Sequence, residues 1–254
     1  MPGEAGARVP VICLAHGSRH PASDAAVVDI ADAVAGLTGG VVRAAYLDFS
    51  PSTLTTVTRV LAAEGHREAV IVPLLFTTAF HMTTDVPEAI AEATAETGMD
   101  LHLAGGVGTG EDLAGLLAVR IAARHTAASL VLYSVGSSVA GANDTVAALA
   151  QDVGRPLGVP AYARVATGGP STGPDALASC VEDAGTGGTA GTGNPVAVEP
   201  LFICPGRLWD IAVDRLGELD VPVSLGEPLG TAVAPLVVSR INAVVEVQGE
   251  EGPR

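Results

Sequence analysis

Three side chains that can bind a metal ion or move a proton follow three different apolar runs of the sequence. His16 comes directly after the first run, Asp48 stands at the end of the second, and His81 follows the third. In an open parallel sheet, ligands bind beyond the carboxyl ends of the strands. Two imidazoles and a carboxylate that meet there could hold a divalent cation or exchange protons near neutral pH. From the residues alone, each histidine could equally be an ordinary loop residue that bonds a backbone carbonyl.

A second group of polar residues stands where the first loop enters a predicted helix. Ser18 and Arg19 follow His16 closely in this loop. Free backbone N–H groups at a helix start, together with a guanidinium, favour the binding of an anion. The same residues are typical of a capping turn that carries a solvated arginine, so both interpretations stay open at this point.

The elements that would position these residues follow an alternating pattern. Short β-branched runs alternate with alanine-rich amphipathic stretches, which predicts parallel strands joined by crossover helices. The predicted strands are 9–15, 41–48, 68–76, 101–104, 129–134, 161–165, 196–202 and 223–225. The predicted helices are 23–37, 51–64, 84–97, 111–125, 142–153, 175–182, 208–219 and 231–247. Ser50 before Pro51 predicts an N-cap and a proline in the first helical position.

The same order of elements occurs twice, which predicts an internal repeat. His-Gly-Ser at 16–18 aligns with Val-Gly-Ser at 135–137, 119 positions later. Pro-Ser-Thr at 51–53 recurs at 170–172, at the same offset of 119. A Pro-Leu pair in the third strand recurs 127 positions later, and the glycine- and threonine-rich stretch 185–193 is long enough to contain the difference.

We therefore predict an α/β fold with two homologous halves, 1–126 and 127–254. Each half is expected to be an open parallel sheet with helices on both faces, with a cleft between the two halves. The second half has Val135 where the first has His16, and an ungapped alignment places Leu208 opposite His81. Because the polar groups are present in only one copy, we expect one active site, in the N-terminal half.

Several other kinds of site and location are disfavoured. The glycine-rich stretch 105–110 follows the fourth predicted strand, and no acidic residue closes a neighbouring strand about 20 residues on, as a dinucleotide site would need. Cys13, Cys180 and Cys204 are too widely spaced for a metal motif or a disulfide framework. The longest apolar stretch, 70–80, is shorter than the roughly 20 residues of a membrane helix. We expect a cytoplasmic protein with no membrane contact.

At this point the residues resemble a known family. The segments LAHGSRHPASD (14–24), AAYLDFSPSTL (44–54) and VIVPLLFTTAFHMTTDVPEAI (70–90) resemble the sirohydrochlorin chelatases, which are class II tetrapyrrole chelatases. The resemblance covers roughly the first 125 residues and continues only as a degenerate repeat, as in long-form members with internally duplicated halves.

The resemblance implies a lyase that inserts Fe²⁺ or Co²⁺ into sirohydrochlorin during siroheme or cobalamin biosynthesis, with iron as the preferred metal. The metal is then a substrate, and no tightly bound cofactor is expected. His16 and His81 take the positions of the metal-binding and catalytic histidines of the family. Asp48 stands where the family often has glutamate, and would assist metal or proton transfer. Neutral imidazoles suit this task because they hold the metal loosely and can accept protons near pH 7.

The charge of the chain limits its partners. Thirteen basic residues face 28 acidic ones, a formal net charge of −15, which argues against nucleic-acid binding. Sirohydrochlorin itself carries many carboxylates, so local positive groups must outweigh this overall charge. The residues we expect to bind these carboxylates are Ser18, Arg19 and Arg207; Arg43 and Arg164 are further candidates.

Two alternatives stay open. The first is a chelatase for another tetrapyrrole, such as a ferrochelatase of the coproporphyrin type. The second is a tetrapyrrole- or metal-binding carrier without catalytic activity, since the family's glutamate and the second-half histidines are missing. We expect a monomer in which the duplication forms an internal pseudo-dimer.

Overall fold

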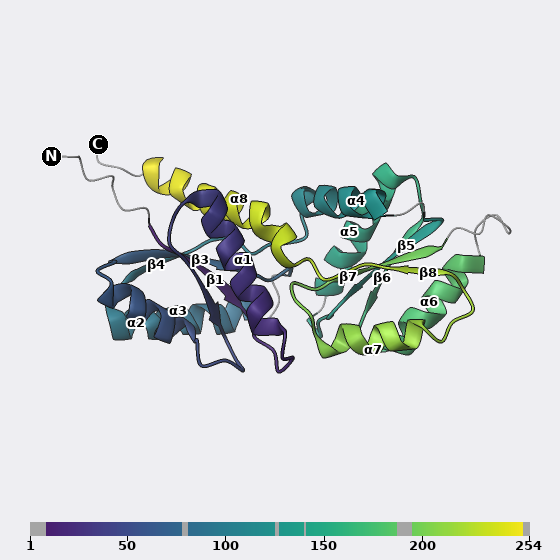
Figure 1. Cartoon of the computed structure of the whole chain (residues 1–254), viewed down its shortest axis with the longest axis horizontal. Helices are drawn as coiled ribbons and strands as arrows, with labels where there is room; N and C mark the ends of the chain where they lie inside the picture. Colours follow the sequence, from purple (N-terminus) through teal and green to yellow (C-terminus); the bar gives the residue numbers. More distant parts are fainter. Residues whose placement is uncertain (1–8, 78–80, 125–126, 140, 187–194, 251–254) are drawn as a thin grey trace. The chain divides into compact units, whose positions relative to one another are not determined.

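The computed structural model describes residues 9–77, 81–124, 127–139, 141–186 and 195–250. For His81, Thr186 and residues 247–250, it describes the backbone but not the side chain. In these residues, eight strands form two four-stranded sheets in which all neighbours are parallel (Figure 1). No helix in the described part of the chain is both long and apolar enough to span a membrane.

The two sheets have the same strand order. The first is β2-β1-β3-β4 and the second is β6-β5-β7-β8. The strands of the first sheet are β1 (Val11–Ala15), β2 (Val42–Tyr46), β3 (Glu68–Pro73) and β4 (Asp100–Leu103). Those of the second are β5 (Ser129–Ser134), β6 (Ala161–Val165), β7 (Val196–Leu201) and β8 (Val223–Leu225). This arrangement confirms the predicted fold class of two homologous parallel-sheet halves.

Helices connect the strands and cover both faces of each sheet (Figure 1). They are α1 (Ser23–Thr38), α2 (Leu54–Ala63), α3 (Val86–Thr97), α4 (Glu111–Arg124), α5 (Ala142–Leu157), α6 (Pro174–Thr186), α7 (Arg207–Leu216) and α8 (Ala234–Glu250). The π-helical turn η1 (His81–Asp85) precedes α3, and the 3₁₀ turn η2 (Gly230–Val233) precedes α8.

The strand register confirms the predicted repeat. Ala15 pairs with Tyr46 in the first sheet, and Ser134 pairs with Val165 in the second, each residue 119 positions after its counterpart. The third strands follow the second offset, since Pro73 pairs with Leu14 and Pro200 with Tyr133. The extra residues of the second half therefore lie between its second and third strands.

The chain divides into two compact units that do not coincide with the sequence halves. Unit 1 contains residues 1–108 and 230–254, and unit 2 contains residues 109–229. Helix α4 follows β4 in the chain but packs against α5 of unit 2. Helix α8 follows β8 but packs against α1 and β3 of unit 1. The predicted halves, 1–126 and 127–254, thus differ from the units because each half supplies its last helix to the other's sheet.

We call α4 and α8 the exchanged helices, because each packs on the sheet of the other half. An arginine of α8 bonds the loop before α4, and an arginine of α4 bonds the loop before α8. Arg240 of α8 donates from Nε to the Gly106 carbonyl at 2.9 Å and from Nη2 to the Val107 carbonyl at 2.7 Å. Arg120 of α4 donates to the carbonyls of Leu229 and Glu227 at 3.4 and 3.2 Å. These bonds satisfy loop carbonyls at the point where the chain leaves each sheet.

The core of unit 1 follows from the alternation of β1. Ile12 and Leu14 point to one face, where they pack with buried residues of α2 and α3 such as Leu54 and Val86. The intervening residues of β1 point to the opposite face, which α1 and α8 cover (Figure 1). Because both faces are covered, the whole of β1 is buried.

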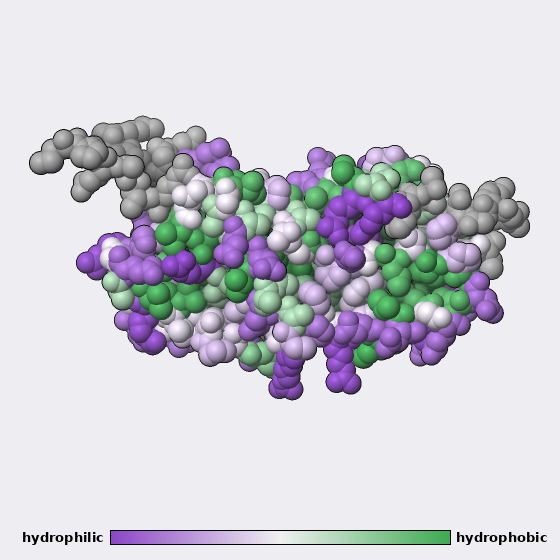
Figure 2. Space-filling model, viewed as in Figure 1, coloured by the Kyte–Doolittle hydropathy of each residue, from purple (hydrophilic) through white to green (hydrophobic). Residues whose placement is uncertain are grey.

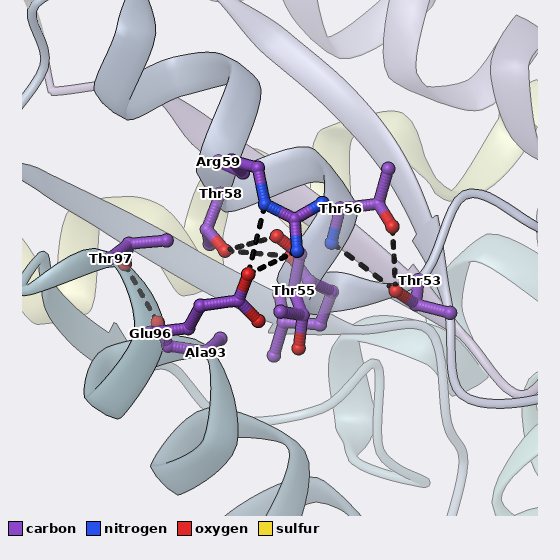
Figure 3. A network of polar contacts seen from close by, with 9 residues as sticks. Thr53, Thr55, Thr56, Thr58, Arg59, Ala93, Glu96 and Thr97 are labelled. Carbon is purple, nitrogen blue, oxygen red and sulfur yellow. Dashed lines mark hydrogen bonds and ion pairs between the residues drawn. The ribbon is translucent and has the colours of Figure 1, made fainter.

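Polar contacts fix α2 and α3 beside each other (Figure 3). Arg59 of α2 donates from Nε to Glu96 of α3 at 3.0 Å, and its Nη2 contacts the same carboxylate oxygen. Thr53 caps α2 by accepting a hydrogen bond from Thr56 N at 3.2 Å. The predicted N-cap Ser50 is therefore wrong: its hydroxyl donates to Asp24 of α1 instead.

Unit 2 has an aromatic core and one buried ionic group. Tyr133, Phe202 and Trp209 pack with ring centroids 6.1–6.4 Å apart between the sheet and α7. On β7, the buried Glu199 accepts hydrogen bonds from Arg124 of α4 at 2.6 and 2.5 Å. Burial raises the pKa of the Glu199 carboxyl, and Arg124 opposes this rise. This contact joins the exchanged helix α4 to the centre of the second sheet.

The surface is mixed in polarity. Figure 2 shows hydrophobic groups on the displayed face of each unit, with hydrophilic ones between them. The exposed large hydrophobic side chains come from several elements, including Leu37 of α1, Val119 of α4 and Tyr162 of β6. Isolated exposed groups of this kind are normal for a folded protein.

Candidate functional site

The candidate site lies at the carboxyl edge of the first sheet. Strands β2, β1 and β3 are neighbours and run parallel, so their carboxyl ends share one edge. His16 follows β1, Asp48 follows β2, and His81 begins η1 after β3. From β1 the chain goes first to β2 at one side and then to β3 at the other, so the strand order reverses between β1 and β3. His16 and His81 follow these two strands. Ligands bind at such points in open α/β sheets.

Backbone hydrogen bonds hold the loop after β1 against the loop after β2. Leu47 N donates to the Ala15 carbonyl at 3.0 Å, and Asp48 N donates to the His16 carbonyl at 2.8 Å. Gly17, with φ +96°, lies so close that an added Cβ would stand 1.9 Å from the Asp48 carbonyl oxygen. Glycine is needed here for both its backbone conformation and its lack of a side chain. The main chains of His16 and Asp48 are therefore adjacent.

The imidazole of His16 is half-buried, and its geometry favours one tautomer. Its Nδ1 lies 3.3 Å from the carbonyl oxygen of Gly17. A carbonyl can only accept, so this hydrogen bond requires the proton on Nδ1. In the neutral ring, Nε2 then carries the lone pair that a metal ion or a proton can take.

The carboxylate of Asp48 is engaged within its own loop. It is exposed, and its Oδ1 accepts a hydrogen bond from Phe49 N at 2.7 Å. This bond stabilises the turn that follows β2 and orients the carboxylate from the main chain. Asp48 is thus placed at the expected edge, with one oxygen already used by the loop.

The loop that enters α1 combines the two interpretations of its residues. Ser18 Oγ accepts a hydrogen bond from His20 N at 3.1 Å, so it caps a turn before α1 begins at Ser23. Arg19 is exposed, and its guanidinium carbon lies 4.8 Å from the centre of the Phe49 ring. The hydrogen bond to Ser18 supports the capping interpretation, and Arg19 packs on an aromatic ring. Carboxylate binding by Ser18 and Arg19 stays a prediction.

The remaining predicted residues are placed only in part. The side chain of His81 lies outside the described part of the structure, and its backbone opens η1. Arg207 is exposed as the first residue of α7, in unit 2. Among the described side chains, no group of three or more histidines, cysteines or acidic residues could hold a metal ion. The roles given to these residues, and the location of the active site in the first half, stay predictions.

Phe49 is a site neighbour that the sequence analysis missed. Its ring centroid lies 6.1 Å from that of His16, with the planes inclined at 34°. Its backbone has φ +63°, which is unusual for an aromatic residue. The repeat contains a signal that could have identified it: Phe49 stands where the second half has a glycine, Gly168, 119 positions later.

Cysteine chemistry is disfavoured at this edge. Cys13 lies inside β1, fully buried, and burial raises the pKa of its thiol to about 12. A thiol with such a pKa is protonated at neutral pH and is therefore neither a nucleophile nor a metal ligand there.

The comparisons with known proteins agree with this fold. The family model CbiX matches residues 10–124. No curated protein matches the chain.

Solved structures match over nearly the whole chain. SirB from Bacillus subtilis with Fe³⁺ has a TM-score of 0.74 at 20% identity, covering 94% of this chain and 97% of that one. The sirohydrochlorin chelatase SirB from Bacillus subtilis subspecies spizizenii in complex with cobalt has a TM-score of 0.70 at 19% identity, covering 93% and 95%. CbiX, described as the terminal enzyme for siroheme biosynthesis in denitrifying bacteria, has a TM-score of 0.63 at 19% identity, covering 93% and 99%. At these identities, the structures show a shared fold.

Proposed function

We propose that this chain, whose residues 10–124 match the CbiX family model, is a sirohydrochlorin chelatase that inserts a divalent metal ion into its tetrapyrrole substrate. The observation that carries the proposal is the position of His16. It stands at the carboxyl end of β1, beside the switch point of the sheet, with its Nδ1 hydrogen-bonded to a backbone carbonyl.

Metal insertion requires two changes at one place. A hydrated cation must exchange its water for ring nitrogens, and two pyrrole N–H protons must leave. We assign the metal to His16 and His81, because neutral imidazoles bind first-row ions and can be protonated near neutral pH. Asp48, next to His16 along the edge, accepts a proton or guides the metal.

The metal is the substrate of this reaction, and we propose Fe²⁺, with Co²⁺ as the alternative. Nitrogen and oxygen ligands bind several first-row ions in a general order of affinity, so supply in the cell decides much of the choice. One structural neighbour is described with Fe³⁺ and another with cobalt, which supports both ions as candidates for this chain.

The substrate carboxylates need positive partners in a chain of net charge −15. We assign this role first to Arg19, which is exposed beside the candidate site. Arg207 is the second candidate, as an exposed arginine at the start of α7. We give Ser18 an indirect part in carboxylate binding. Its hydroxyl accepts a hydrogen bond from His20 N and so stabilises the turn that carries Arg19.

The direct test measures metal insertion by the absorbance change of sirohydrochlorin with Co²⁺ or Fe²⁺. We expect His16→Ala and His81→Ala each to lower kcat/KM by at least about 100-fold, because each removes a metal ligand or proton acceptor. The matched control is Val135→Ala, which truncates the second-half counterpart of His16 and should leave turnover unchanged. Wild-type rates in both histidine variants would contradict the assignment.

A carrier function is the second candidate, and one observation favours it. Asp48 stands where the family often has glutamate, and its Oδ1 already accepts a hydrogen bond from Phe49 N. A carrier would bind the tetrapyrrole or the metal stoichiometrically and without turnover. The same absorbance assay at substrate excess separates the two: a chelatase converts many equivalents, and a carrier stops at one.

A further inference from the structure

Phe49 occupies a backbone conformation that disfavours it. Its φ of +63° lies in the left-handed region, where a Cβ is crowded and a bulky residue is an outlier. The ring is also 46% exposed, so burial does not account for an aromatic residue here. Strained residues of this kind persist at functional sites more than elsewhere.

The second half shows what the corresponding turn carries where no site is expected. Thr167 N donates to the Val135 carbonyl at 2.9 Å, as Asp48 N does to His16. The next residue is Gly168, with φ +93°, which adopts the left-handed region freely. An added Cβ at Gly168 would stand 2.5 Å from the Ser137 carbonyl oxygen, so the second turn has no room for a side chain. The first turn has room for a phenyl ring at the corresponding position, which only the first half carries.

The ring of Phe49 contacts two residues of the candidate site. The Arg19 guanidinium carbon is 4.8 Å from the ring centre, within the range of a cation–π interaction. The His16 ring is 6.1 Å away, within the range of aromatic pairs. Phe49 thus joins the predicted metal ligand to the predicted carboxylate-binding arginine.

The partner of Arg19 differs in kind from those of most other arginines. In the described part of the chain, six other arginines are paired with carboxylates: Arg43 with Glu64, Arg59 with Glu96, Arg120 and Arg124 with Glu199, Arg155 with Asp152, and Arg215 with Asp175. Among the described contacts, Arg19 is instead held by an aromatic face. A ring holds a guanidinium without neutralising it, so its N–H groups can still bind an incoming carboxylate.

We propose that Phe49 is a positioning residue, which holds the Arg19 guanidinium un-neutralised beside His16 so that a substrate carboxylate is bound at a fixed place relative to the metal. The inference rests on the proposed function and deepens it, since it selects a polyanionic flat substrate over the bare metal ion. Metal binding by itself needs no such arginine.

The test is a double-mutant cycle on KM for sirohydrochlorin and on the Kd for sirohydrochlorin without metal. Phe49→Leu is expected to raise both by about 2- to 5-fold, the range of an exposed cation–π contact. Arg19→Ala is expected to raise them further, and the double variant should match Arg19→Ala alone, because the two residues act as one. Phe49→Tyr keeps a ring and should retain wild-type values.

Stability separates positioning from folding. Phe49→Gly copies the second-half residue and suits the left-handed backbone, so its Tm should equal or exceed that of the wild type while its KM rises as in Phe49→Leu. Tyr162→Leu is the matched control, because it removes a ring that is 40% exposed from β6 of unit 2 and should leave KM unchanged.

Each outcome decides the inference. Additive effects of Phe49→Leu and Arg19→Ala, or an unchanged Kd in Phe49→Gly, overturn the positioning role while leaving chelatase activity in place. If the wild type binds sirohydrochlorin without turnover, the proposed catalysis fails, and the Kd cycle still decides the role of Phe49. If the wild type does not bind sirohydrochlorin, both proposals fall.

Discussion

The loop after β1 and the loop after β5 share a glycine of the same conformation and differ in their side chains. Gly17 and Gly136 both have positive φ, and an added Cβ at either would collide with the neighbouring loop's carbonyl. His16 in the first loop corresponds to Val135 in the second. The close approach at this glycine is therefore common to both halves, and the side chains that could do chemistry are present in only one of them.

Inside the sheets, the second sheet has a polar side chain where the first has an apolar one. Strand register places Val72 of β3 opposite Cys13, and Glu199 of β7 opposite Leu132, at equivalent positions. Unit 1 is apolar there, whereas unit 2 buries a carboxylate that Arg124 pairs. At this position the second sheet therefore has a buried carboxylate paired with Arg124 of α4, and this pair ties α4 to the second sheet.

The largest effect that we expect tests the shared backbone. Gly17→Ala places a Cβ 1.9 Å from the Asp48 carbonyl oxygen, and Gly136→Ala places one 2.3 Å from that of Thr167. Backbone strain and overpacking together should lower the free energy of unfolding by about 4 kcal/mol in each variant. Chemical denaturation measures this. A loss in only one of the two would show that the loops are not equivalent.

The next effect tests the difference between the two interiors. Glu199→Leu leaves the guanidinium of Arg124, which is 27% exposed, without its carboxylate. We expect a loss of on the order of 3 kcal/mol in unfolding free energy. The double variant Glu199→Leu, Arg124→Leu removes the carboxylate and the nearer of its two guanidinium partners, leaving Arg120 at the site. It is the control, and should recover most of the loss in thermal or denaturant unfolding. A single variant as stable as the wild type would mean that the ion pair is not a tie.

The smallest effect tests the carboxylate at the candidate site. Asp48→Asn keeps the size of the side chain and removes its charge, so we expect kcat for metal insertion to fall by about 10-fold or more. Asp48→Glu should retain turnover because it keeps the carboxylate. Thr167→Val, at the equivalent position of the second half, is the control and should leave kcat unchanged. Equal rates in Asp48→Asn and the wild type would remove Asp48 from the proposed chemistry.

Much of the fold could be predicted because its signals are local. The predicted strands 129–134, 161–165 and 223–225 match β5, β6 and β8 residue for residue, since β-branched runs between turns specify a strand within a few residues. The two offsets of the repeat reappear in the strand register. Helix starts were less predictable: Thr53, rather than Ser50, caps α2, because capping depends on the geometry of the turn as well as on residue type.

The sequence by itself determined which residues stand at the ends of which strands, and so placed His16, Asp48 and the backbone of His81 at one sheet edge. Only the tertiary structure decided which sheet α4 and α8 cover, because an amphipathic helix records that it has an apolar face but not which apolar surface it meets. Only the tertiary structure brought Phe49 against Arg19, because that contact joins two loops 30 residues apart in the chain through a left-handed turn. Periodicity encodes local conformation, whereas contacts between distant segments depend on how all the elements pack together.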